Sequence, residues 1–167
     1  MSYNFDHLLN KISIGGDSEN TWRTLQGGTL TTSNNEWKYI LSECENADKR
    51  YGYGKIADMK GLIILPESWN LPSGLTFTPG ATETAWSNQY SYSEWAAMGK
   101  NGAVFLPAAG SLAGTAVSNV NTNGCYWSSS CSDSSNTSPF SFSGNSYNFT
   151  GIGRHYGYSV RLVRNAN

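Results

Sequence analysis

Apolar residues recur at helical spacing in the first half of the chain. One group that follows the i, i+3, i+4, i+7 pattern is Phe5, Leu8, Leu9 and Ile12. A second group has the same spacing and comprises Trp37, Ile40, Leu41 and Cys44. Just before the second group, Ser33 and Glu36 have the spacing of a capping box, which begins a helix. The pattern therefore predicts two amphipathic helices, each with one buried face.

A third helix is predicted to begin after Ser91. Ser91 and Glu94 repeat the capping-box spacing, and Trp95 and Met98 follow as apolar positions. Gly102 is typical of the residue just beyond a helix end.

Strand patterns dominate the rest of the chain. Two short apolar runs at 61–66 and 102–107 end in proline and predict buried strands. The C-terminal part predicts three or four antiparallel strands, at about 124–130, 138–143, 146–150 and 157–164. Segments 70–82 and 108–123 are rich in Gly, Pro and Ser and predict long loops. Early helices followed by clustered strands favour an α+β fold, with two or three helices and short antiparallel sheets.

Length and charge narrow the class of protein. A chain of 167 residues predicts a single domain over residues 1–167. The net charge of −1 gives no electrostatic reason to expect a nucleic-acid partner. No apolar run approaches the roughly 20 residues of a spanning helix, so we expect no membrane insertion. No signal peptide is visible in the chain.

The most unusual composition lies near the C-terminus. Residues 128–161 contain no Lys, Glu, Gln, Met or Trp and are rich in Ser, Asn, Gly and aromatic residues. Every residue type present has a codon that ends in a pyrimidine, whereas the five missing types have none. Randomising the adenines of AAC or AAT codons would reach this set of residues. The composition also suits a recognition surface, because Tyr and Phe supply contact area and Ser, Asn and Gly supply adaptable hydrogen bonds.

A plainer interpretation stands beside this one. A Ser/Asn/Gly-rich loop can lack the same residue types for ordinary compositional reasons. The composition alone therefore leaves two alternatives, a diversified surface and an undiversified polar segment.

Residues suited to catalysis or metal binding are few. The chain has three Cys and two His, and their spacing matches no zinc site. Cys44 is expected to be a buried thiol. Cys125 and Cys131 are six residues apart and could form a disulfide or stay free, with free thiols favoured. Asp133 is the only acid in 128–161, and one carboxylate cannot perform two-carboxylate glycoside hydrolysis. We expect no catalytic residue, no metal and no cofactor.

Six separated motifs carry a family resemblance. In chain order they are WRTL at 22–25, EW at 36–37, GLIILP at 61–66 with Trp69, GAVFLPAAG at 102–110, YWSS at 126–129 and YGYSVR at 156–161. Together they resemble the Fibrobacter succinogenes major paralogous domain, which is common in gut Bacteroidales.

The resemblance implies a C-type lectin-like fold. Formylglycine-generating enzymes share that fold, as do the variable proteins of diversity-generating retroelements. Those variable proteins place their diversified residues on the last strands and loops, which corresponds to 125–161 here. The chain departs from the family's usual Tyr/Asn-rich run within this region, while the flanking motifs are kept. That distribution of change is what site-directed diversification would produce.

Two other lectin-like functions have less support. Calcium-dependent sugar binding in related folds uses a Glu-Pro-Asn or Gln-Pro-Asp loop and a Trp-Asn-Asp strand, and none of these occurs here. A calcium ion also needs several oxygen ligands, which one acid does not supply. A formylglycine-generating type of enzyme would need a cysteine pair, for which Cys125 and Cys131 are the only candidates.

We therefore expect a ligand-binding or adhesin module that displays a diversified surface. The alternatives are an undiversified surface or carbohydrate-binding domain of the same family and, third, an enzyme of the formylglycine-generating type. The expected location is extracellular, on a cell surface or on a phage virion such as a tail.

Predicted core and surface positions can be separated. The side chains expected to be buried are Trp37, Trp95, Tyr126, Trp127 and Val160. For Trp127 the alternative is a ligand-stacking residue. The candidate ligand-facing residues are Cys131, Asp133, Ser135, Asn136, Ser138, Phe140, Ser141, Asn145, Tyr147, Asn148, Phe149, Ile152, Arg154 and His155. About half of these could be ordinary strand residues, because alternate side chains of a strand point inward.

The kind of partner follows from the apolar members of that set. They are Phe140, Tyr147, Phe149, Ile152 and His155, and exposed together they would form an interaction patch. Aromatic anchors ringed by small polar residues favour a protein receptor. A glycan is the runner-up, because aromatic rings also stack on sugars.

Overall fold

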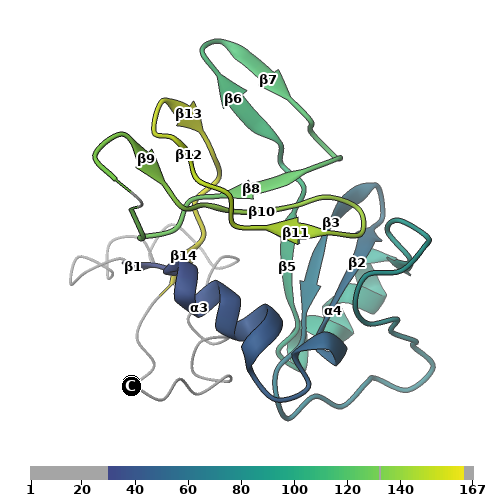
Figure 1. Ribbon diagram of the computed structural model, residues 1–167. Helices are drawn as coiled ribbons and strands as arrows, with labels where there is room; N and C mark the ends of the chain where they lie inside the picture. The colour runs from purple at the N-terminus through teal and green to yellow at the C-terminus, as the bar shows by residue number, and fades with distance from the viewer. Residues whose placement is uncertain (1–29, 132, 164–167) are drawn as a thin grey trace, which may run out of the picture.

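The computed structural model describes residues 30–131 and 133–163, whose arrangement Figure 1 shows. The helix predicted at 5–12 and the motif at 22–25 lie outside the described residues. Within the described part, the chain forms two α-helices and fourteen short strands, most of them paired antiparallel. The fold is α+β, as the sequence predicts.

The first described helix begins where the capping box places it. Helix α3 (Asn34–Lys38) continues into a π-helical turn, η1 (Tyr39–Glu43). The backbone N–H of Glu36 donates to Ser33 Oγ at 3.2 Å, and the N–H of Ser33 donates to Glu36 Oε2 at 2.7 Å. Trp37, Ile40 and Leu41 are almost completely buried, so the predicted apolar face is confirmed.

Helix α4 (Tyr92–Lys100) has the same kind of beginning, with Ser91 and Glu94 bonded reciprocally. Met98 is fully buried. Trp95 is only half-buried and packs against Phe105, with ring centroids 5.6 Å apart. Beyond the helix, Gly102 adopts a φ of +91°, a conformation that glycine accommodates without strain.

The largest sheet has four strands in the order β4-β2-β3-β5. They are β2 (Tyr51–Ile56), β3 (Met59–Ile64), β4 (Asn88–Tyr90) and β5 (Val104–Pro107). β3 pairs antiparallel with β2 and β5, which confirms the two predicted apolar strands. β4 lies parallel to β2. The sheet buries Leu62, Ile63 and Ile64 from β3, one of its two inner strands.

The predicted C-terminal strands form smaller sheets. β8 (Gly124–Tyr126), β10 (Phe140–Phe142) and β11 (Tyr147–Asn148) make an antiparallel sheet in the order β11-β10-β8. Two further antiparallel pairs are β9 (Asn136–Thr137) with β12 (Ile152–Gly153), and β1 (Leu30–Thr31) with β14 (Leu162–Val163).

Two expectations for this part of the chain are wrong. The predicted loop 108–123 contains a hairpin, β6 (Ser111–Ala113) and β7 (Ala116–Ser118), which pairs with β13 (Tyr156–Gly157). Val160 was expected to be buried but is 51% exposed. The reason is that the predicted strand 157–164 is interrupted between β13 and β14, which leaves Val160 outside either strand.

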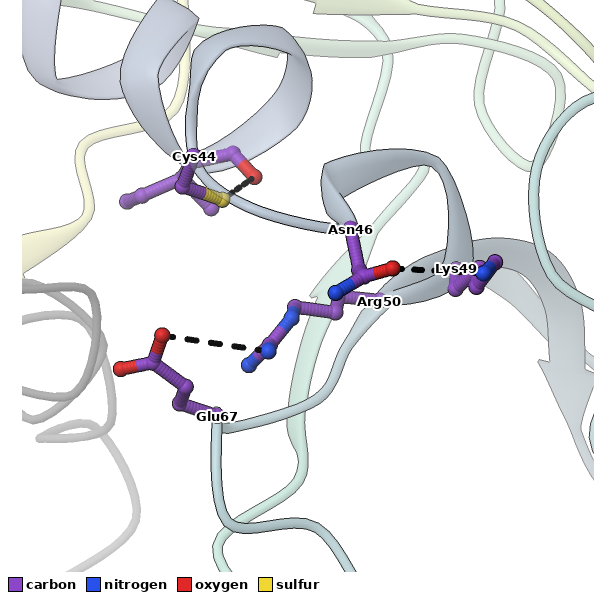
Figure 2. Close-up of polar contacts among 6 residues, drawn as sticks. Cys44, Asn46, Lys49, Arg50 and Glu67 are labelled. Atoms are coloured by element: carbon purple, nitrogen blue, oxygen red, sulfur yellow. Dashed lines mark hydrogen bonds and ion pairs between the residues drawn. The ribbon is translucent and has the colours of Figure 1, made fainter.

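A polar junction joins the first helical segment to the large sheet (Figure 2). The short 3-10 helix η2 (Ala47–Lys49) leads to Arg50, whose Nη2 lies 3.9 Å from Glu67 Oε1 after β3. Lys49 Nζ donates to Asn46 Oδ1 at 3.2 Å, and Cys44 Sγ donates to the Ile40 carbonyl at 3.4 Å. The Arg50–Glu67 contact links the residue that leads into β2 to the segment after β3, and the other two contacts lie within the helical segments.

Candidate functional site

The candidate site is built from two C-terminal segments that β9 and β12 bring together. Thr137 pairs with Ile152, and Asn136 pairs with Gly153. Beyond the strands, the backbone N–H of Arg154 donates to the Ser135 carbonyl at 3.2 Å. Residues about 20 apart in sequence therefore lie side by side at the surface.

Asp133 organises the first of these segments. Its Oδ1 accepts the backbone N–H groups of Ser135 and Asn136 at 2.7 and 2.8 Å. Its Oδ2 accepts Asn136 Nδ2 at 2.9 Å, and Arg154 Nη2 donates to its backbone carbonyl at 3.1 Å. The side-chain bond from Asn136 contributes most to lowering the pKa of Asp133, followed by the two backbone bonds. The exposed loop is therefore held in one conformation by its own hydrogen bonds.

A second group of polar candidates lies on β10, β11 and their turn. Ser141 Oγ donates to Asn148 Oδ1 at 2.8 Å across the strand pair. The N–H of Thr150 donates to the same oxygen at 3.2 Å. Asn145 is exposed in the turn between the two strands. Ser141 and Asn148 therefore form a polar cross-strand pair.

Phe140 was expected to face a ligand, and that prediction is wrong. Its side chain is 0% exposed and stacks on Trp37, with ring centroids 4.7 Å apart. Alternation along β10 explains the difference, because Phe140 and Phe142 point into the core while Ser141 points away from it.

The aromatic patch expected around Phe140 is largely core as well. Tyr147 and Phe149 are half-buried and pack with Phe140 at centroid distances of 6.3 and 5.7 Å. The Tyr147 hydroxyl donates to the Leu41 carbonyl at 3.2 Å. Of the five apolar or aromatic candidates, His155 alone is exposed to solvent, Tyr147, Phe149 and Ile152 are half-buried, and Phe140 is buried. The apolar patch that favoured a protein receptor is therefore absent at these positions.

The fourteen candidates divide by exposure. The exposed ones are Cys131, Asp133, Ser135, Asn145, Asn148, Arg154 and His155. The half-buried ones are Asn136, Ser138, Ser141, Tyr147, Phe149 and Ile152. Phe140 is buried. Whether the accessible residues contact a ligand stays a prediction.

A column of aromatic rings runs from Trp127 to His155, which follows Arg154 in the chain, and was not anticipated as a unit. Trp127 stacks on Tyr158 with ring centroids 4.7 Å apart, whereas the pairs Tyr158–Tyr156 and Tyr156–His155 are tilted, at 6.2 and 4.4 Å. Trp127 is half-buried, which is intermediate between the buried core residue and the exposed ligand-stacking residue that the sequence left open. Burial raises the pKa of Tyr158 to about 12, with Cys125 beside it as the next cause. The alternation of Tyr156, Gly157 and Tyr158 was the available sequence signal.

The backbone fixes the Trp127–Tyr158 end of this aromatic column. The N–H of Trp127 donates to the Ser159 carbonyl, and the N–H of Ser159 donates to the Cys125 carbonyl, both at 2.9 Å. These two bonds tie β8 to the segment that carries Tyr158.

The chemistry of the described residues is that of hydrogen bonding and ring contact. All three cysteines are free, with Cys44 and Cys125 buried and Cys131 exposed. Among residues 30–131 and 133–163, no group of three or more His, Cys, Asp or Glu side chains is placed to hold a metal ion. No helix in the same ranges is long and apolar enough to cross a membrane.

Comparison with protein-family models, curated proteins and solved structures found no match to this chain.

Proposed function

We propose that this chain is a ligand-binding module in which a C-type lectin-like scaffold displays a diversified recognition surface. The observation that carries the proposal is the pairing of the Asp133 loop with the Arg154 segment. It gathers exposed Asp133, Ser135, Arg154 and His155 beside a column of aromatic rings. Polar groups held by internal bonds beside aromatic rings are suited to binding, because little order is lost when a ligand docks.

The composition of the segment supports diversification. Aromatic side chains at 140, 142 and 126 are buried, while the exposed positions are mostly small, polar or charged, with Val160 as an exception. Exposed side chains can change at little cost to the core, so changes at those positions would alter recognition and leave the fold intact.

A protein receptor is the ligand class we favour, with a glycan as the alternative. The earlier reason for this preference, a patch around Phe140, does not apply. The reason that remains is that exposed Arg154 lies in the same short segment as Tyr156 and Tyr158, since Arg, Tyr and Trp dominate protein–protein hot spots. By its resemblance, the module would act as an adhesin or receptor-binding tip on a bacterial surface or a phage tail.

The proposal is tested by array binding with matched triple variants. The site variant carries Ser135→Ala, Arg154→Ala and His155→Ala. The control carries Thr84→Ala, Gln89→Ala and Lys100→Ala, at three exposed positions outside the site. Labelled proteins are applied to an array of bacterial cell-surface proteins and to a glycan array. We expect wild type and control to bind alike and the site variant to lose more than about tenfold in affinity.

The outcomes are separable. Binding to the glycan array alone would support the proposed recognition surface and would change the favoured ligand class from protein to glycan. Equal binding by the site variant, or no binding of the wild type to either array, would contradict the proposal.

A further inference from the structure

The β6–β7 hairpin projects from the rest of the described molecule with both faces open to solvent (Figure 1). Leu112 and Val117 face each other across the two strands and are 40% and 65% exposed. Val120, just beyond β7, is 59% exposed. Two-stranded hairpins are marginally stable alone, and among the described residues the one further strand that pairs with this hairpin is β13, through two residues along β6.

The outer edge of β7 is free to pair with another strand. Gly114 has a φ of +60° at the first position of a two-residue turn, so Ala113 and Ala116 flank the turn. In such a hairpin the pair that flanks the turn is hydrogen-bonded, and hydrogen-bonded and non-hydrogen-bonded pairs alternate from there along the ladder. The next pair, Leu112 with Val117, is therefore not hydrogen-bonded, so the N–H and C=O of Val117 point away from β6. In the described ranges, β7 has no strand partner other than β6.

This edge lacks the usual protection against strand pairing. Natural edge strands are commonly blocked by charged residues, by proline or by a bulge. Here residues 101–132 contain no Asp, Glu, Lys or Arg, and 111–118 contain no proline. The whole chain carries a net charge of only −1, so repulsion between copies is weak as well.

We infer that β7 is a self-association edge and that its partner is β7 of a second copy of this chain. An antiparallel pair about a two-fold axis would set Val117 opposite Val117, with two N–H···O=C bonds between their backbones. The uncharged edge meets an identical uncharged edge, which is the self-complementarity that a two-fold interface requires. Strands of three residues bury little area, so the dimer is weak and depends on concentration. This inference is independent of the proposed ligand surface, which a dimer would display twice.

Sedimentation velocity over about 10 μM to about 1 mM tests the inference, because small interfaces give affinities in that range. We expect the wild-type sedimentation coefficient to rise with concentration toward that of a dimer. Val117→Lys would place two like charges opposite each other, and its dimerisation should weaken by more than about tenfold. The matched control is Tyr92→Lys on α4, where Tyr92 is also 65% exposed. It should dimerise like the wild type.

A second variant removes the edge donor without adding charge. Val117→Pro lacks the outward N–H and should also stay monomeric, and thermal melts of all variants verify folding. A wild type that is monomeric up to the highest concentration would overturn the inference and leave the edge for a strand of another protein. The inference would also be overturned if the folded Val117→Lys variant dimerised like the wild type, or if Tyr92→Lys lost dimerisation to the same extent as Val117→Lys.

Discussion

At the scale of single residues, the Asp133 carboxylate shows how a polar loop becomes a fixed surface. It accepts three hydrogen bonds from Ser135 and Asn136, and Arg154 bonds to its backbone from the neighbouring segment. Hydrogen bonds to the charged form lower the pKa of a carboxyl group, so the loop is best organised above the ordinary carboxyl range. Ser and Asn thereby present defined groups to solvent without a hydrophobic core of their own.

The three cysteines differ sharply in their expected reactivity. Burial raises the pKa of Cys44 to about 11 and also raises the pKa of Cys125, so both thiols stay protonated at pH 8. Cys131 is exposed. We predict that one thiol per folded chain reacts rapidly with Ellman's reagent and that two more react after denaturation, because the thiolate is the reactive form. A Cys131→Ser variant should lose the fast phase, and no fast phase in the wild type would contradict the placement of Cys131.

At the scale of elements, β10 separates core from surface within three residues. Phe140 and Phe142 fill the space beside Trp37 and Tyr126, while Ser141 bonds to Asn148 on the outer side. The aromatic content of the C-terminal segment therefore serves mainly the core in this strand.

Adjacent substitutions in β10 should differ strongly in stability. We predict that Phe140→Ala lowers the free energy of unfolding by about 3–5 kcal/mol, because a buried aromatic ring is lost. The matched variant Ser141→Ala removes one partly exposed hydrogen bond and should cost about 1 kcal/mol or less. Urea denaturation followed by Trp fluorescence measures both. Equal costs for the two variants would show that the strand faces are misassigned.

Elements with strong local patterns were predictable, and those that depend on distant contacts were not. Both capping boxes and the face of Trp37 follow from residues within one or two helical turns. Strand β2 was missed because its two glycines weaken the strand pattern. Close packing against β4 explains why position 54 is a glycine, since a Cβ there would lie 2.5 Å from the Asn88 carbonyl oxygen. Only the parallel pairing of β2 with β4 reveals that constraint.

At the scale of the whole molecule, the candidate site could be located by segment but not by side chain. The unusual composition of 128–161 selected the region of the candidate site, in which Asp133, Ser135, Arg154 and His155 do reach solvent. Composition could not separate Phe140 from them, because inward direction depends on the register of β10 with β8. Likewise, the column from Trp127 to His155 joins residues nearly 30 apart through strand pairing.

For the whole chain, the central claim that we propose is that the solvent-facing C-terminal positions are diversified while the positions beneath them are fixed. Sequencing the DNA around the coding region in its source genome tests this claim most directly. We predict a reverse transcriptase gene and a template repeat that matches the codons for 125–161 except at adenines. The mismatched codons should include those of exposed Ser135, Arg154 and His155 and should exclude those of buried Tyr126, Phe140 and Phe142. The absence of a repeat, or mismatches concentrated at the buried aromatic codons, would contradict the claim.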